Sequence, residues 1–330
     1  MAKIFYQLTK FRDPALHVIA RANQILEEYA EKGYDLTLRQ LYYQFVARGL
    51  IDNNQREYKN LGSIVNDARL CGLIDWDHIV DRTRNVRKNA HWSSPSDIVK
   101  TCAQQFQIDK WAGQRSRIEV WIEKDALIGV VERVCRKLDI PYFSCRGYVS
   151  QSEIHEAALD RYKPWMAEGQ DVVILHLGDH DPSGIDMSRD IADRLLMFQA
   201  HVDLRRIALN MDQVRRYNPP PNPAKITDSR ATKYIEEHGD ESWELDALSP
   251  EVIEDLITSE VDDIIDQETF DVALASEQEM RDRLALVSKH WDHVAEHVTT
   301  LPIEQPIEIE IPARRKPAAK KTKPKPKKRK

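Results

Sequence analysis

An apolar segment that ends in two closely spaced aspartates constrains the fold of this chain more than any other feature. Residues 172–175 read Val-Val-Ile-Leu, and Asp179 and Asp181 follow, just before the turn-forming sequence Pro-Ser-Gly. A continuous apolar run of this length suits a strand in the interior of a parallel sheet, which is buried on both faces. Side chains alternate along an extended chain, so the two aspartates can project to one side while His180 points away. We therefore predict an α/β fold with both carboxylates at the carboxyl end of a strand, where open α/β sheets bind ligands.

A second segment has the same pattern. Residues 117–128 read Arg-Ile-Glu-Val-Trp-Ile-Glu-Lys-Asp-Ala-Leu-Ile, which predicts a strand that runs into a helix, with Glu123 at the end of the strand. Proteins hold Mg²⁺ with one or two carboxylates together with water or phosphate oxygens. Glu123, Asp179 and Asp181 would supply such ligands, so the sequence predicts a magnesium site. The alternative interpretation is a surface loop in which the aspartates only form a turn.

The order and spacing of these segments resemble the Toprim domain, which occurs in topoisomerases, primases and some nucleases. The sequence Asp-His-Asp-Pro-Ser-Gly-Ile at 179–185 is most similar to the topoisomerase VI A subunit and its relative, the meiotic double-strand-break protein. Residues 147–150, Gly-Tyr-Val-Ser, open an expected helix as in that family. The resemblance implies a Rossmann-like, mainly parallel sheet with Glu123, Asp179 and Asp181 as metal ligands.

Residues 36–45 read Leu-Thr-Leu-Arg-Gln-Leu-Tyr-Tyr-Gln-Phe and resemble the Arg-x-x-Tyr-Tyr segment of the same family. In the family this segment lies in a winged-helix domain and carries the nucleophilic tyrosine, which the resemblance places at Tyr43. Thr37 is a suitable helix cap, and a helix that starts there brings Arg39 and Tyr43 to one face, one turn apart. A guanidinium beside the phenol favours the phenolate, which is otherwise scarce at neutral pH. We predict Tyr43 and Arg39 as catalytic residues.

Packing is the alternative role for both tyrosines, and it is the commoner role for a tyrosine in a helix. Leu38, Leu41 and Phe45 mark an apolar stripe to which the tyrosines could belong. Tyr42 lies about 100° from Tyr43 around the helix and suits the core better. It remains the alternative nucleophile.

The resemblance implies that the Tyr43 phenolate attacks a DNA phosphorus in an Mg²⁺-dependent reaction that leaves a 5′ end attached to the protein. A double-strand break then requires a homodimer, because one chain supplies one tyrosine, and in the family each tyrosine works with the metal site of the opposite subunit. Topoisomerase VI draws ATP turnover from a separate B subunit, so an ATPase B-like partner is a further possibility. Two alternatives stay open: a Toprim nuclease that activates water, and a noncatalytic DNA-binding or recombination protein. Gln40, Leu41 and His180 depart from the usual residues of the family, which bears on efficiency more than on fold.

Three expected helices precede the acidic segments: residues 14–32, the helix of Tyr43, and residues 58–73. Residues 72–76 are expected to form a turn into a wing, and with the three helices they predict a winged helix, whose third helix enters a groove of double-stranded DNA. Basic residues on that helix, beyond the wing and after the Toprim-like segment are candidate phosphate contacts. These predicted DNA-binding residues are Lys59, Arg69, Arg82, Arg84, Arg87, Lys225 and Arg230. A solvated charge run is the alternative for the group that begins at Arg82.

The formal net charge of −6 conceals a division along the chain. Residues 314–330 contain eleven Lys or Arg and no acid, whereas residues 236–268 contain fourteen acids and no Lys or Arg. The basic tail is expected to be disordered and to hold DNA through its phosphates, with a solubility tail as the alternative. The acidic segment repels DNA, so we expect it to lie away from the duplex, contact a partner or bind the tail.

These features predict five regions: a winged-helix domain at 1–92, a linker at 93–115, a Toprim domain at 116–235, acidic helices at 236–300 and a basic tail at 301–330. No apolar run approaches a membrane span and the first residues lack a signal-peptide core. We therefore expect no membrane partner and a cytoplasmic protein, associated with the nucleoid in a prokaryote or virus.

The spacing of the cysteines and histidines does not indicate a further metal site or a disulfide framework. The four cysteines have no Cys-x-x-Cys spacing, which indicates neither a zinc ribbon nor a disulfide framework. His290, His293 and His297 are spaced for one face of a helix, where zinc binding is the less common alternative to a partly exposed polar face.

Overall fold

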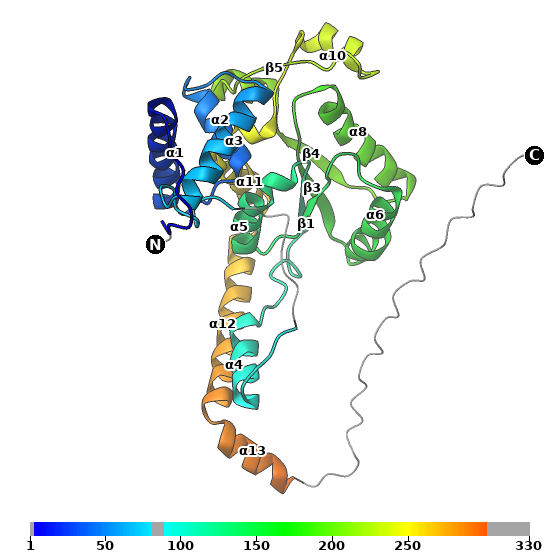
Figure 1. The fold of residues 1–330 in the computed structure, drawn as a ribbon. Helices are drawn as coiled ribbons and strands as arrows, with labels where there is room; N and C mark the ends of the chain where they lie inside the picture. Colours follow the sequence, from blue (N-terminus) through cyan, green and yellow to red (C-terminus); the bar gives the residue numbers. More distant parts are fainter. Residues whose placement is uncertain (1–2, 81–88, 302–330) are drawn as a thin grey trace, which may run out of the picture. The chain divides into compact units, whose positions relative to one another are not determined.

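Four parallel strands form the sheet of an α/β fold in the computed structural model, which describes residues 3–80 and 89–301 (Figure 1). The Val-Val-Ile-Leu run lies in a strand that pairs in parallel with a neighbour on each side. The predicted α/β class and the interior position of this strand are therefore confirmed. The strands, in the spatial order β2-β1-β3-β4, are β1 (Ser116–Ile122), β2 (Tyr142–Ser144), β3 (Asp171–Leu177) and β4 (Asp203–Ala208).

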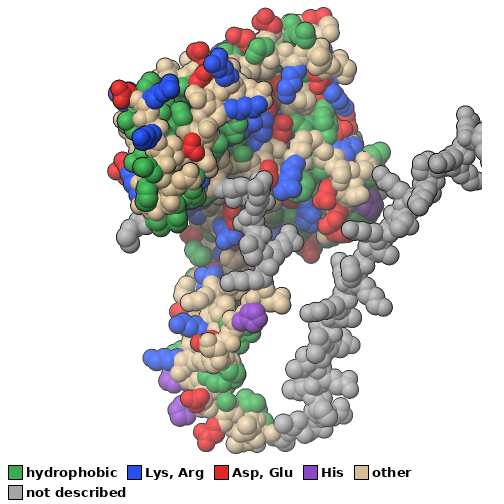
Figure 2. Space-filling model, in the orientation of Figure 1, with side chains coloured by type: hydrophobic (Ala, Val, Ile, Leu, Met, Phe, Trp, Pro, Cys, Tyr) green, Lys and Arg blue, Asp and Glu red, His purple; other side chains and the backbone are tan. Residues whose placement is uncertain are grey.

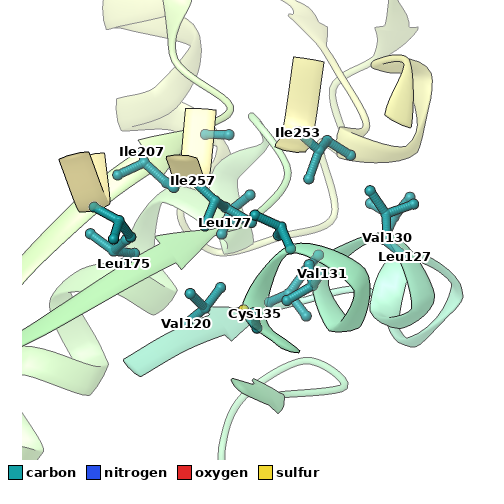
Figure 3. Packing of buried hydrophobic residues seen from close by; sticks show 14 of the residues in the cluster. Val120, Leu127, Val130, Val131, Cys135, Leu175, Leu177, Ile207, Ile253 and Ile257 are labelled. Atoms are coloured by element: carbon teal, nitrogen blue, oxygen red, sulfur yellow. The ribbon is translucent and has the colours of Figure 1, made fainter. Parts of the chain in front are cut away.

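Helices cover both faces of the sheet, so alternate residues of a strand belong to two different cores. Leu175 and Leu177 of β3 pack with α5 and α11 on one face (Figure 3). Val172 and Ile174 of the same strand belong to a second core with α6 and α8. The elements around the sheet are η1 (Asp125–Leu127), α5 (Ile128–Leu138), α6 (Gln151–Glu156), η2 (Ala157–Tyr162), α7 (Lys163–Ala167), α8 (Pro182–Met197), α9 (Met211–Tyr217) and α11 (Pro250–Asp262).

A helical body precedes the sheet and has a core of its own. It consists of α1 (Asp13–Glu31), α2 (Leu38–Ala47) and α3 (Gln55–Leu70). Leu36 forms a parallel bridge with Ile79 beyond the third helix, in the region where the sequence predicts a wing. Ala247, from the single-turn helix η3 (Leu245–Ala247), lies in the same core and ties this body to the sheet side of the molecule.

Capping residues explain where α2 and α3 begin. The Thr37 side chain accepts a hydrogen bond from the backbone of Gln40, whose side chain in turn accepts from the Thr37 backbone. This capping box confirms the predicted start of the helix and gives Gln40 a structural role. The third helix begins at Gln55, before the predicted Tyr58, because the Asn54 side chain caps its first turn.

The segment after α9 is extended, as its prolines predict, and leads to short elements above the ends of the strands (Figure 1). These are β5 (Asn222–Pro223), α10 (Ala231–His238) and β6 (Glu241–Ser242). β5 and β6 pair in antiparallel fashion, and Trp243 forms an antiparallel bridge with His180. The bridge holds the first part of the acidic segment against the aspartate-bearing turn.

Two compact units divide the chain. Residues 1–91 and 106–280 form unit 1, which contains the helical body and the sheet, and residues 92–105 and 281–330 form unit 2. The predicted linker contains α4 (Pro95–Gln105), and the C-terminal helices are α12 (Gln267–Lys289) and α13 (Trp291–Thr300). Within unit 2, the Ser96 hydroxyl donates to the Ser288 carbonyl at 2.8 Å. Among the described residues, no helix combines the length and apolarity that a membrane span requires.

Candidate active site

The three predicted metal ligands lie at the carboxyl ends of two neighbouring strands. Ile122 pairs with Leu177 in the β1–β3 register, so Glu123 and Gly178 leave the sheet side by side. The Glu123 carboxylate accepts a hydrogen bond from the Asp179 backbone at 2.9 Å. We call Glu123, Asp179 and Asp181 the acid edge.

Burial and mutual repulsion disfavour ionisation at this edge. Burial, followed by the charge of Asp179, raises the pKa of Glu123 to about 7. Burial also raises the pKa of Asp179, although the ammonium of Lys124 opposes that shift. A bound cation would relieve such repulsion, so the electrostatics of the edge suit a positively charged ligand.

The two aspartates already have protein partners. Asp179 accepts from the Leu245 backbone at 2.9 Å and pairs with Lys124 Nζ at 2.6 Å. Asp181 caps α8 by accepting from the Gly184 backbone at 2.6 Å. Within residues 3–80 and 89–301, no group of three or more His, Cys, Asp or Glu side chains is arranged to hold a metal ion. By residue type and strand position the acid edge fits Mg²⁺, but its carboxylates would have to exchange these contacts for the ion.

A partly buried arginine and a glycine hold the turn that carries the aspartates. Arg206 of β4 donates to the carbonyls of Gly178 at 3.0 Å and Asp179 at 2.6 Å. Burial lowers the pKa of Arg206 to about 10, while the nearby acids favour its charged form. A Cβ at Gly184 would overlap the Asp179 carbonyl oxygen, so only glycine fits there.

Tyr43 lies beside Arg39, as a helix over this segment predicts. The Arg39 guanidinium carbon is 5.8 Å from the centre of the Tyr43 ring. The Asn222 side chain hydrogen bonds the phenol, which with Arg39 favours the phenolate. Burial outweighs both effects and raises the pKa of Tyr43 to about 12. Arg39 therefore favours the phenolate, as predicted, but its effect is smaller than that of burial, because Tyr43 is only 4% exposed.

Four charged side chains, which we call the ionic bridge, join this tyrosine to the acid edge. Arg39 pairs with Asp246 at 2.6 Å through Nε and with Glu244 through Nη2. Lys124 Nζ lies 3.6 Å from Glu244 and 4.0 Å from Asp246, besides its pairing with Asp179. Two members of the acidic segment, Glu244 and Asp246, thus pair with the arginine beside the candidate nucleophile.

A cavity of about 280 Å³ opens beside the two tyrosines. Its lining comes from α2, from α3 and the loop before it, and from the segment around β5 and β6. The lining residues are Arg39, Tyr42, Tyr43, Asn53, Asn54, Gln55, Tyr58, Asn222 and Glu244. The side of Tyr43 thus borders a space that could admit part of a substrate.

His180 faces away from the acid edge into an aromatic cluster. Its Nδ1 lies 2.8 Å from the Tyr234 hydroxyl, and its ring packs against His238 and Trp243. Burial lowers the pKa of His180 to about 4. A neutral imidazole therefore fixes α10 against the aspartate turn.

The predicted DNA-binding residues have different surroundings. Lys59 is exposed on α3, whereas Arg69 donates to the Trp76 and Ile79 carbonyls and stacks on the Trp76 ring. Arg69 therefore has a structural role besides any phosphate contact. Arg82, Arg84 and Arg87 lie outside the described residues, as does the basic tail.

Two further predicted contacts lie near the aspartate turn. Lys225 Nζ is 3.7 Å from Asp181, and Arg230 donates to Asp186 at 2.7 Å. On the face of unit 1 seen in Figure 2, basic and acidic side chains are interspersed. The charge on that face therefore does not by itself mark a path for DNA.

The candidate zinc histidines lie where α12 gives way to α13, so they do not share one continuous helix. His290 is the residue before α13, and its ring centre is 6.5 Å from that of His293. His297 follows in the last turn of α13.

Five residues of the site are not among those that the sequence predicts. Lys124 directly follows Glu123 in sequence, and this position is the feature that could have identified it as a site residue. Arg206 follows a second arginine in β4, whose sequence Asp-Leu-Arg-Arg-Ile-Ala does not set it apart. Glu244 and Asp246 belong to the acidic segment, in which nothing distinguishes them, and Asn222 lies among prolines that indicate only an extended chain. No protein-family model matches the chain, and no curated protein matches its sequence.

Proposed function

We propose that this protein cleaves DNA by tyrosine transesterification, as an A-subunit-like relative of topoisomerase VI with a winged-helix and a Toprim domain. The observation that carries the proposal is the continuous run of contacts from Tyr43 through the ionic bridge to the acid edge of the same chain. It supports the pairing of Tyr43 with the acid edge of its own chain, whereas the resemblance implies the metal site of the partner. It connects a tyrosine and an arginine on a helix with carboxylates at the ends of parallel strands, all within unit 1. The motif resemblance suggested the same residues independently of any geometry.

In this reaction the Tyr43 oxygen forms a bond to a DNA phosphorus, and the bond from that phosphorus to the 3′ oxygen of the neighbouring sugar breaks. The phenol proton must leave before or during attack, since the pKa of Tyr43 is about 12. Arg39 and Asn222 stabilise the phenolate that results. The product is a 5′ phosphotyrosine and a free sugar hydroxyl. Because the number of phosphoester bonds is conserved, the step can run backwards and reseal the strand.

Glu123, Asp179 and Asp181 would hold Mg²⁺, which stabilises charge on the phosphate and the leaving oxygen when it is bound. Arg206 and Gly184 position the aspartate turn for that purpose. Two copies of the chain would be needed to cut both strands, and an ATPase B-like subunit would couple the reaction to strand passage.

The water-activating nuclease is the second candidate, and the raised pKa of Glu123 favours it. A carboxyl group with a pKa of about 7 can exchange protons with water near neutral pH. Such an enzyme would release DNA ends that carry no protein, and Tyr43 would be structural.

The test is covalent trapping. Protein is incubated with end-labelled duplex DNA and Mg²⁺, stopped with detergent and separated by electrophoresis. We expect label to migrate with the protein, to be lost with a chelator, and to be lost with Asp179→Asn. Asp193→Asn, at an exposed position of α8, is the matched control. Cleavage that yields only protein-free ends would favour the nuclease, and binding without scission would favour a noncatalytic protein.

A further inference from the structure

The acids that contact Arg39 and Lys124 differ in how deeply they are buried. Asp246 and Asp179 have side chains that are 1% and 5% exposed, and they anchor Arg39 and Lys124 respectively. Glu244 is 28% exposed and contacts both cations with the same oxygen, Oε2. One accessible carboxylate oxygen therefore lies between two cations that other, buried acids hold in place.

Neither cation is saturated by its buried anchor. A guanidinium carries five N–H donors and an ammonium three, so each can serve a second anion. Glu244 takes that place for both cations and also lines the cavity beside Tyr43. Arg39 and Glu244 line the cavity, and Lys124, which is 23% exposed, contacts the same Glu244 oxygen, so an anion that took the place of that oxygen would meet both cations.

We infer that Arg39 and Lys124 form a binding site for one phosphodiester group of the DNA strand, and that Glu244 occupies this site until DNA displaces it. Two cations on separate elements suit an anion with several oxygens, because each can contact a different one. The site lies beside the ring of Tyr43, so a phosphodiester bound there is close to the nucleophile. This inference rests on the proposed function for its substrate and adds Lys124 and Glu244 to the residues that control it.

Glu244 then acts as a built-in competitor. It keeps the two cations from binding stray anions and makes occupation of the site cost the separation of two ion pairs. Neutralising it should strengthen binding of a phosphodiester, whereas removal of an ordinary acid on the same segment should change only the overall charge. Glu241, exposed on β6, is such an acid.

The experiment measures DNA affinity in the Tyr43→Phe background without divalent metal, so that neither covalent chemistry nor metal binding contributes. A fluorescent short duplex is titrated with Glu244→Gln, Glu241→Gln, Lys124→Gln and the Glu244→Gln/Lys124→Gln double variant. At low salt we expect Glu244→Gln to bind about tenfold more tightly and Glu241→Gln less than about twofold. The gain should vanish when Lys124 is also replaced, and Lys124→Gln should lower the slope of log affinity against log salt by about 0.9.

Equal effects of Glu244→Gln and Glu241→Gln, or a full gain without Lys124, would overturn the inference. Glu244→Gln is close in shape to the original residue, and circular dichroism checks its fold. Glu244→Asp serves as a second variant because it shortens the reach to Lys124, and we expect it to strengthen binding by an intermediate factor.

Inorganic phosphate separates this inference from the proposed function. If no variant binds DNA, the proposed function fails, and thermal unfolding with added phosphate then decides the site. We expect phosphate to raise the melting temperature of Glu244→Gln more than that of the parent or of Glu241→Gln. Equal shifts in all three proteins would overturn the phosphodiester site as well.

Discussion

The two faces of α2 carry neighbouring tyrosines with equal burial and different surroundings. Tyr42 and Tyr43 are each 4% exposed, and both line the same cavity. The Tyr42 hydroxyl donates to Asn53 Oδ1 at 3.0 Å and lies 3.2 Å from the Asn54 carbonyl. Tyr43 instead has the Arg39 guanidinium and a hydrogen bond from Asn222 beside it.

The comparison shows that burial alone does not identify a reactive phenol. Burial is the largest influence on both tyrosines and raises the pKa of each. The charge of Arg39 lowers the pKa of both tyrosines, so what differs is the side-chain partner of each hydroxyl. The Tyr42 hydroxyl donates to Asn53, an acceptor that retains the proton, whereas the hydrogen bond from Asn222 lowers the pKa of Tyr43. Asn53 links the faces, since it accepts from Tyr42 and its amide donates to Asn222 at 2.9 Å.

Exchange of the two phenols for phenylalanine is expected to have the largest effect and can break the comparison. Tyr43→Phe removes the attacking oxygen, so formation of the protein–DNA adduct should fall by at least about a thousandfold. Tyr42→Phe frees Asn53 to shift slightly, and we expect a loss of no more than a few fold. Trapping with end-labelled DNA measures both.

Loss of the adduct in Tyr42→Phe alone would reverse the assignment. Each variant also needs a thermal unfolding curve, because a tyrosine that only packs would reduce the adduct in proportion to the folded fraction. Unchanged stability with loss of the adduct would identify a chemical role.

The pH dependence of adduct formation sharpens the comparison. The fraction of phenolate rises about tenfold per pH unit below the pKa of Tyr43, which is about 12. Between about pH 8 and about pH 9.5 the single-turnover rate should therefore rise with pH, and Glu123 is already largely ionised there. Arg39→Gln should lower the rate about tenfold or more at each pH, because the phenolate loses its neighbouring positive charge.

Arg39→Lys is the control, since it keeps the charge, and we expect it to retain more activity than Arg39→Gln. A rate that does not change with pH would indicate that proton loss from the phenol does not limit attack. Equal losses in the two arginine variants would mean that the guanidinium shape, and not its charge, is what matters.

Local patterns were sufficient to predict the strand and helix framework. The apolar run before Asp179 predicts a strand in the interior of a sheet, and Thr37 predicts the start of α2, where its capping box with Gln40 spans three residues. Such features depend on neighbours in sequence. They can therefore be predicted without knowledge of the tertiary structure.

The ionic bridge could not be predicted in the same way, because its members are distant in sequence. Arg39 and Glu244 are 205 residues apart, and nothing near either of them indicates the other. The direction in which the pKa of Tyr43 shifts could not be predicted either, since it depends on how much water the fold removes from around the phenol. A motif identifies the candidate nucleophile, whereas tertiary packing determines its pKa.

The smallest expected effect concerns the face of Tyr42, whose ring meets that of Tyr58 edge to face with centres 5.3 Å apart. If this face is there for packing, a double-mutant cycle with Tyr42→Leu and Tyr58→Leu should give a coupling free energy of unfolding of about 0.5–1.5 kcal/mol. Tyr58→Phe keeps the ring and should leave most of that coupling intact, so it serves as the control. Adduct formation by the folded fraction should change little in the Tyr58 variants, because Tyr58 contacts the neighbour of the nucleophile. A large loss of adduct without loss of stability would extend the reactive face of α2 to the Tyr42 side and remove the contrast between the two tyrosines.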